Sequence, residues 1–287
     1  MEHAPKECAC CGKTERRLLV RIGDWTVYKC DGCGLGVLDP RPDPAELGAL
    51  YRENYFVSHY EEELELGSPG MQRRISQEAH RIRFFGKFKR KGLVLDIGCG
   101  RGYFLHACRV RGYDVVGLDF SEDAAASAWK TLRIQVKAGL LRDGLFEPES
   151  IDVITMWHSL EHTEDPGRYL GQAWRWLRPG GLLVVDVPNH EGTDAIRIGA
   201  AWDGWSLPYH FFHFTPSTLS SMIARHGFRV LRSKDYHSEY VKGRLRRIPV
   251  VGLLARPIAK FYSGTSYAVV AEKTESPRSG GANAGAK

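Results

Sequence analysis

Short apolar runs alternate with helical patterns between residues 92 and 190. The runs occupy residues 93–96, 114–119, 134–137, 151–157 and 182–187, and helices are predicted at 103–111, 121–132 and 166–177. Strands that alternate with helices in this way form a parallel sheet covered by crossover helices. A helix at 216–226 and strands at 228–234 and 267–273 are predicted further on. The sequence therefore predicts an α/β fold built on one doubly wound, Rossmann-like sheet.

A glycine-rich turn joins the first predicted strand to its helix. Asp96 ends the strand, and Gly98, Gly100 and Gly102 follow at alternate positions. Glycine lets a ligand approach the backbone closely, but the spacing differs from the Gly-x-Gly-x-x-Gly turn of dinucleotide-binding folds. A carboxylate at Asp96 would repel a pyrophosphate and attract a ligand that carries an ammonium and a sulfonium. The charge pattern therefore favours S-adenosylmethionine over NAD as the bound molecule.

The ends of two further strands are expected to complete this binding site. Asp119 ends the second strand, where its carboxylate can accept hydrogen bonds from both hydroxyls of a ribose. Phe120 would form a wall for the adenine ring, and Trp157 ends the fourth strand at the same edge of the sheet. In such sheets ligands bind at the carboxyl ends of the strands. We therefore predict that all three residues line the cofactor site.

Because it contains this glycine-rich turn with Asp96 and Asp119, segment 92–190 resembles the class I S-adenosylmethionine-dependent methyltransferases. From Cys8 to about Lys273 the chain is similar to a bacterial subgroup that carries two Cys-x-x-Cys pairs at its N-terminus. The narrower resemblance rests on these motifs: Cys30-Asp31-Gly32-Cys33-Gly34-Leu35, Pro40-Arg41-Pro42, Tyr51 with Tyr55-Phe56, Trp157-His158-Ser159-Leu160-Glu161-His162, Leu177-Arg178-Pro179-Gly180-Gly181 and His210-Phe211-Phe212-His213-Phe214.

The resemblance implies a seven-stranded sheet whose last strand runs antiparallel. It also implies that Asp96 and the three glycines lie at the methionine end of the cofactor and that Asp119 holds the ribose. The sequence departs from the family at one point, because an acid that often contacts the adenine amine falls at Leu140. We therefore expect this contact from the backbone of Leu140 and Leu141 or from Asp143.

Two cysteine pairs mark the N-terminal segment. Cys8 and Cys11 form one Cys-x-x-Cys-Gly turn, and Cys30 and Cys33 form a second one eighteen residues later. Two such turns supply the four thiolates of a tetrahedral zinc site. All four positions would be filled by sulfur, so the predicted Zn²⁺ is structural. Cys10 is out of register and is expected not to bind the metal.

Histidines near the end of the fourth strand are the candidate catalytic residues. His158, Glu161 and His162 match the His-x-x-Glu-His pattern of some zinc peptidases, but their position after a strand of this sheet argues against that class. The preferred interpretation makes His158 a general base or a residue that orients the acceptor. Two alternatives stay open: Glu161 and His162 could pin the loop by hydrogen bonds, or they could bind a second metal, as is proposed for related quinone O-methyltransferases with Glu-x-x-Glu-His here.

A second aromatic and histidine-rich loop follows the fifth strand. It contains Trp202, Trp205, His210 and His213, and it can close over an acceptor and exclude water. For His210 a catalytic role and a role in a hydrophobic plug are weighted equally. His213 is expected to be a hydrogen-bonded core residue.

Composition and charge define the remaining expectations. The apolar content of 43% suits a folded core, no apolar stretch is long enough for a membrane span, and no signal peptide is apparent. A cytoplasmic protein is therefore expected. The predicted parts are a zinc module at residues 1–38, a helical linker or lid at 39–90 with helices at 45–51 and 71–91, the methyltransferase domain at 91–275 and a disordered tail at 276–287. The zinc module and the domain are expected to have separate cores.

The predicted activity is O-methylation of a small molecule or glycan, assisted by a histidine. The first alternative is C-methylation of a nucleotide-linked deoxysugar. RNA methylation is less favoured, because basic runs are not interleaved with a stacking motif and residues 60–65 are acidic. A non-enzymatic binding protein would not need an intact cofactor loop. The acceptor and the oligomeric state are left open.

A basic and apolar segment stands between the last two predicted strands. Residues 248–255 are apolar, and Arg244, Arg246, Arg247, Arg256 and Lys260 surround them. One interpretation is a patch that binds a membrane surface. The preferred one is a helical insert whose apolar face packs on the sheet while its arginines are solvated.

Overall fold

A computed structural model describes residue 3, residues 6–43, residue 46 and residues 64–274. Apart from residue 46, the predicted helix at 45–51 lies outside the described residues, as do the motif residues Tyr51, Tyr55 and Phe56 and the predicted tail at 276–287.

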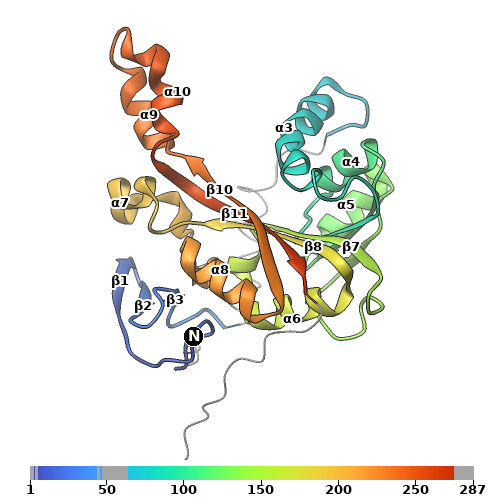
Figure 1. Ribbon diagram of the computed structural model, residues 1–287, viewed down its shortest axis with the longest axis horizontal. Coiled ribbons are helices and arrows are strands. Elements are labelled where there is room, and N and C mark those ends of the chain that lie inside the picture. Colours follow the sequence, from blue (N-terminus) through green and yellow to red (C-terminus); the bar gives the residue numbers. More distant parts are fainter. Residues whose placement is uncertain (1–2, 4–5, 44–45, 47–63, 275–287) are drawn as a thin grey trace, which may run out of the picture.

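A seven-stranded sheet forms the centre of the molecule (Figure 1). Strands β4 to β8 pair in parallel, and β11 runs antiparallel to both of its neighbours, β8 and β10. This confirms the predicted fold, including the antiparallel last strand. In spatial order the strands are β10 (Phe228–His237), β11 (Ser263–Lys273), β8 (Leu177–Pro188), β7 (Ile151–Trp157), β4 (Leu93–Ile97), β5 (Asp114–Asp119) and β6 (Val136–Ala138).

Helices cover both faces of the sheet. Side chains of successive strand residues point to opposite faces, and both faces carry apolar residues that must be buried. Val94 packs with the face covered by α3 (Pro69–Phe85) and α4 (Tyr103–Val110), whereas Leu95 packs with the opposite face. The helix α5 (Glu122–Leu132) lies beside α4, and α6 (Pro166–Trp176) and α8 (Pro216–Arg225) cover the other face (Figure 1). Ser121 caps α5 as predicted, since its hydroxyl accepts a hydrogen bond from the backbone N–H of Ala124 at 3.1 Å. The helix α3 ends at Phe85, several residues before the predicted end.

A small antiparallel sheet contains the cysteine segment. Its strands, in spatial order, are β1 (Arg16–Ile22), β2 (Trp25–Cys30), β3 (Gly36–Leu38) and β9 (Phe212–His213). The last of these comes from the aromatic loop of the large domain, where Gly36 pairs with His213 and Val37 with Phe212. Cys8, Cys30 and Leu35 belong to the same buried cluster as Trp176 and Met222 of the large domain. The expectation of two separate cores is therefore wrong, because the aromatic loop joins them by strand pairing.

Shorter helices complete the described chain. The turn η2 (Leu160–His162) follows β7, and α7 (Thr193–Ile198), η3 (Gly199–Ala201) and η4 (Asp203–Trp205) follow β8. Between β10 and β11 the chain forms α9 (Glu239–Arg246), η5 (Val251–Leu254) and α10 (Ala255–Ala259). Among the residues described, no helix has both the length and the apolar character needed to cross a membrane.

Candidate active site

The glycine-rich turn follows β4, the strand at which the strand order of the parallel sheet reverses. In space β7 lies on one side of β4 and β5 on the other. This is the point at which open α/β sheets bind ligands. Gly98 has a φ of 78°, and a Cβ atom built there would lie 2.6 Å from Cβ of Ser159. Gly102, also with a φ of 78°, occupies the N-cap position of α4. Both positions therefore need glycine for conformation, and Gly98 also for the close approach of the loop after β7.

Asp96 is a buried carboxylate at the end of β4. Its Oδ1 atom accepts a hydrogen bond from Thr155 Oγ1 at 2.6 Å. Burial raises the pKa of Asp96 to about 7, although the Thr155 hydrogen bond opposes this rise. A cationic group placed beside the carboxylate would favour its ionised form. Asp96 is therefore suited to an ammonium-bearing ligand.

Asp119 organises the loop from the next strand. Its Oδ2 atom accepts a hydrogen bond from the backbone N–H of Gly100 at 2.7 Å, and its Oδ1 atom accepts one from Ser121 at 2.9 Å. Burial raises the pKa of Asp119, and these two hydrogen bonds oppose the rise. Each carboxylate oxygen can accept more than one hydrogen bond. Asp119 can therefore hold the loop and still accept hydrogen bonds from ligand hydroxyls.

The predicted adenine contacts are spread over two short segments. Phe120 has 45% of its surface exposed beside Asp119, and Leu140 is also exposed. Leu141 is buried in the core, so its side chain cannot reach a ligand. The carboxylate of Asp143 accepts a hydrogen bond from Gln172 Nε2 at 2.7 Å.

A groove of about 250 Å³ connects the turn to one candidate catalytic residue, His158. Asp96, Gly98, Gly100, Trp157 and His158 line it, whereas Gly102, Asp119, Phe120, Leu140, Leu141, His162 and His210 do not. Trp157 Nε1 is buried and has no hydrogen-bond partner among the described residues. An unpaired buried donor and a carboxylate with a raised pKa both fit a polar, cationic ligand such as S-adenosylmethionine.

The helix α3 forms one wall of the groove, which the sequence did not indicate. Glu78 is buried there and makes ion pairs with Arg74 and Arg81, each at 3.1 Å. The guanidinium of Arg81 stacks over the ring of Trp157 at 5.0 Å. The predicted lid helix therefore exists, but helical periodicity alone does not show which of its charged residues turn inward.

His158 stands between two buried carboxylates at the end of β7. Its Nδ1 atom lies 3.4 Å from Glu161 Oε1, and its Nε2 atom lies 3.8 Å from Asp186 Oδ2. Burial alone would lower the pKa of His158, but Asp186 and Glu161 outweigh it and raise the pKa above the ordinary value. The side chain keeps 40% of its surface exposed, and the residue has a φ of 53°, which is uncommon outside glycine. The imidazole thus lies between the two carboxylates and remains open to the groove.

One partner of His158, Asp186, and the residue that binds Asp186 in turn, Tyr236, lie far away in the sequence. Asp186 is near the end of β8, and Tyr236 on β10 donates a hydrogen bond from its hydroxyl to Asp186 Oδ2 at 3.0 Å. The position of Asp186 at the carboxyl edge of the sheet could have marked it as a candidate. No sequence signal distinguishes Tyr236.

The two other candidate catalytic histidines, His162 and His210, lie close to Glu161. His162 Nδ1 lies 3.0 Å from the carbonyl of Tyr209, and His210 Nδ1 lies 3.0 Å from the carbonyl of Gly204. Their rings make an edge-on contact at 4.5 Å, and burial lowers the pKa of His210 well below the ordinary value. Glu161, His162 and His210 each offer one ligand atom within 4.8 Å of the others. The structure therefore brings the three together without placing them in the groove.

His213 lies deeper in the same loop and is buried. Burial, together with neighbouring histidines, lowers its pKa to about 3. The burial agrees with the expected core position, but Nε2 of His213 has no hydrogen-bond partner among the described residues.

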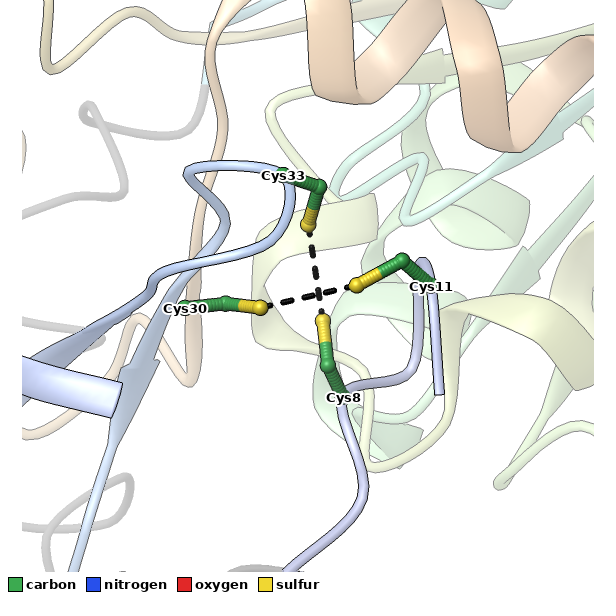
Figure 2. A group of neighbouring side chains, drawn as sticks. All are labelled: Cys8, Cys11, Cys30 and Cys33. Atoms are coloured by element: carbon green, nitrogen blue, oxygen red, sulfur yellow. Dashed lines mark hydrogen bonds between the residues drawn. The ribbon is translucent and has the colours of Figure 1, made fainter. Parts of the chain in front are cut away.

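The four cysteines of the N-terminal segment form one cluster (Figure 2). Cys8 Sγ lies 3.6 Å from Cys33 Sγ, and Cys11 Sγ lies 3.5 Å from Cys30 Sγ. All four sulfur atoms are within 4.8 Å of one another. Contact with Cys33 and burial raise the pKa of Cys8 to about 12, so the cluster favours thiolates only if a cation neutralises them. The sulfur of Cys10 instead faces the carbonyl of Thr218 at 3.8 Å.

Comparison with known proteins identifies the central part of the chain. Residues 70–233 match the model of a methyltransferase domain. The chain is 35% identical over 187 residues to a ubiquinone biosynthesis O-methyltransferase of Pseudomonas putida, covering 60% of this chain and 72% of that protein. It is 28% identical over 138 residues to a protein of Mycolicibacterium smegmatis named "probable S-adenosylmethionine-dependent methyltransferase", covering 48% of this chain and 52% of that protein. The chain thus spans about half the length of the mycobacterial relatives it matches.

Solved structures show the same fold. A S-adenosylmethionine-dependent methyltransferase from Archaeoglobus fulgidus superposes with a TM-score of 0.53 at 23% identity, covering 70% of this chain and 94% of that one. Another from Mesorhizobium loti superposes with a TM-score of 0.53 at 19% identity, covering 69% of this chain and 100% of that one. The sheet order, the glycine-rich turn with its two acids and the family match agree. The chain therefore belongs to the family of S-adenosylmethionine-dependent methyltransferase domains.

Proposed function

We propose that the protein transfers the methyl group of S-adenosylmethionine to a hydroxyl oxygen of a small molecule or glycan, and that His158 accepts the hydroxyl proton. The observation that carries this proposal is the position of His158, which lines the groove beside the glycine-rich turn between two buried carboxylates. The ubiquinone biosynthesis enzyme of Pseudomonas putida, which is an O-methyltransferase by name, supports oxygen as the acceptor atom.

Methyl transfer is an in-line displacement at the sulfonium. The acceptor oxygen forms the new bond to carbon, the carbon–sulfur bond breaks with its electron pair passing to sulfur, and S-adenosylhomocysteine leaves. The protein aligns the reactants and excludes water. Nδ1 of His158 faces Glu161, whereas Nε2 is beyond hydrogen-bond distance from Asp186 and can take the hydroxyl proton. The carboxylates then stabilise the imidazolium.

The proposal assigns further roles to the surrounding residues. Asp96 would bind the ammonium of the cofactor, Asp119 the ribose, and Phe120 the adenine ring. Tyr236 and Asp186 would act on the reaction through His158. His210 and His162 are positioning residues for Glu161 and the aromatic loop in this scheme, since neither lines the groove.

A structural Zn²⁺ at Cys8, Cys11, Cys30 and Cys33 is part of the proposal. Four thiolates around zinc at about 2.3 Å place the sulfur atoms about 3.8 Å apart. The observed separations of 3.6 and 3.5 Å support this arrangement. With four protein ligands the ion would supply folding energy and take no part in methyl transfer.

The test combines an acceptor screen with one variant. Purified protein is incubated with S-adenosylmethionine and three groups of acceptors: hydroxylated aromatics, nucleotide-linked sugars and short RNAs. Release of S-adenosylhomocysteine with a hydroxylated acceptor and a methoxy product supports O-methylation. A C-methyl product or a methylated RNA would replace it by one of the alternatives.

The variant His158→Gln tests the base. Its turnover should fall by about 10²–10⁴-fold, the usual contribution of general base catalysis, with little change in cofactor affinity. His226→Gln is the matched control, because His226 is half-buried at the end of α8 outside the groove. Normal turnover of His158→Gln would remove His158 from the reaction.

A further inference from the structure

The segment between β10 and β11 forms a projecting helical hairpin, residues 239–262, here termed the basic hairpin. It consists of α9, η5 and α10 and extends beyond the ends of the two strands, away from the sheet (Figure 1). From Tyr240 to Tyr262 the sequence has no acidic residue. Its basic residues are Lys242, Arg244, Arg246, Arg247, Arg256 and Lys260. The hairpin is therefore a concentrated positive surface.

The apolar side chains of the basic hairpin face solvent. Val250 is 82% exposed, Leu253 is 87% exposed and Phe261 is 88% exposed. Ile248 and Leu254 are exposed as well. The expected packing of residues 248–255 against the sheet is therefore wrong, because the hairpin carries this run beyond the sheet edge. Large exposed apolar residues on an element this rich in arginine indicate a surface that contacts another molecule or a membrane.

The hairpin is anchored at its base. Asp194 on α7 is buried and accepts hydrogen bonds from the backbone N–H groups of Glu239 at 3.1 Å and Tyr240 at 3.2 Å, and from the hydroxyl of Ser238. Ser238 also caps α9. Ala255 and Ala259 are buried. The exposed tip therefore belongs to an ordered element.

The backbone at the tip is also unusual. Val250 has a φ of 68°, a conformation that is rare and costly for a β-branched residue. It precedes η5 and has its side chain in solvent. Nothing among the described residues compensates this cost by burying the valine.

The hairpin stands at the same edge of the sheet as the active site. β10 runs parallel to β8, since each is antiparallel to β11. Both strands therefore end at the edge where the groove lies. Tyr236 on β10 contacts Asp186 of the active site, and the hairpin begins three residues later. A surface bound by the hairpin would lie on the active-site edge of the molecule.

From these observations we infer that the basic hairpin binds the surface of an anionic phospholipid bilayer. Val250, Leu253 and Leu254 at the tip enter the interfacial region, and the arginines contact the anionic headgroups. Stable binding to a membrane surface needs two contributions. Here the inserted apolar side chains supply one, and the attraction of the basic side chains to anionic lipids supplies the other. Resting on the proposed function, the inference also makes the acceptor a molecule with a lipid anchor, presented at headgroup level.

Two other occupants fit the surface less well. A second copy of the chain would set one basic hairpin against another, and the like charges would repel. A nucleic acid would satisfy the arginines but would leave the exposed leucines at the tip without a role. The bilayer accounts for both the charge and the apolar tip.

Vesicle co-sedimentation of the full chain at physiological salt tests the inference. Vesicles of phosphatidylcholine alone are compared with vesicles that also contain phosphatidylglycerol. We expect at least about a tenfold higher partition coefficient with phosphatidylglycerol. Leu253→Ser with Leu254→Ser, and separately Arg246→Glu with Arg247→Glu, should each lower this coefficient at least tenfold while cofactor affinity is unchanged.

Matched controls place the same changes elsewhere. Val110→Ser changes an exposed apolar residue on α4, and Lys130→Glu with Arg175→Glu reverses two exposed charges outside the hairpin. These variants should bind vesicles as the wild type does. Absence of binding to anionic vesicles, or binding that the hairpin variants leave intact, overturns the inference. A dimer in sedimentation equilibrium that the apolar variants dissociate would assign the surface to a second copy instead. Because binding is measured without turnover, failure of the proposed methylation reaction would not affect this result.

Discussion

Asp96→Asn separates the cost of a buried charge from its contribution to cofactor binding. The pKa of Asp96 is raised from 3.8 to about 7 in the folded chain. One pKa unit corresponds to about 1.4 kcal/mol, so ionisation of this carboxyl costs the folded chain up to about 4 kcal/mol at pH 8. Since the folded chain holds the proton more tightly than the unfolded chain, this contribution lowers stability as the pH rises from about 4 to about 7.

Asparagine removes the charge and can still accept the hydrogen bond of Thr155. Without cofactor, the variant should therefore melt several degrees higher than the wild type at pH 8, and the difference should vanish near pH 4. Its affinity for S-adenosylmethionine should fall about 10- to 150-fold, because a charge-assisted hydrogen bond of about 1.5–3 kcal/mol is lost. Thermal melting at a series of pH values and titration calorimetry measure the two effects.

A second aspartate provides the control for this experiment. Asp152 is also buried, but it lies at the other end of β7, where it accepts hydrogen bonds from Arg178 and from the backbone of Leu93, both at 2.9 Å. Asp152→Asn should lower the melting temperature and leave cofactor affinity intact. If Asp96→Asn behaves in the same way, the proposed contact between Asp96 and the ammonium is refuted.

Three further predictions concern the cofactor, the base and the metal. Asp119→Ala should weaken S-adenosylmethionine binding by about 1.5–3 kcal/mol in calorimetry, and an unchanged affinity would exclude Asp119 from the ribose site. Turnover should rise with pH through a pKa above 6.5, because the carboxylates favour protonated His158 and only the neutral imidazole accepts a proton; a rate that does not vary with pH between 5 and 9 would speak against this base. Metal analysis of reductively purified protein should find about one zinc per chain, and its removal by a chelator should lower both the melting temperature and turnover. Cys10→Ser should retain the zinc, and a loss of metal in that variant would contradict the four-cysteine assignment.

Local patterns in the sequence account for the parts of the fold that depend on neighbouring residues. The turn from Asp96 to Gly102 and the two Cys-x-x-Cys turns each have a short spacing and a strict conformational or chemical requirement. Each can therefore be recognised from a few neighbouring residues. The strand at 151–157 was also predictable, because β-branched and large apolar residues dominate it, although it contains Asp152 and Thr155.

Features that depend on distant partners were not predictable. The carboxylates around His158 come from η2 and β8, and Tyr236 is added from β10. The inward turn of Glu78 depends on how α3 packs against β4 and β7, which the charge pattern of a helix does not specify. The shared core follows from pairing between Val37 and Phe212, two residues far apart in the chain. The exposure of residues 248–255 depends on how far the hairpin extends beyond the sheet.

The pairing of β3 with β9 limits how this chain can be divided. Phe212 and His213 of the aromatic loop form the edge of a sheet whose other strands are all N-terminal to residue 39. A fragment cut to residues 70–233 would expose the edge of β9 and would also lose β11, which lies between β10 and β8. Such an open edge invites pairing with other chains. A chimaera made with a relative should therefore take the cysteine segment, the aromatic loop and β11 from the same parent protein.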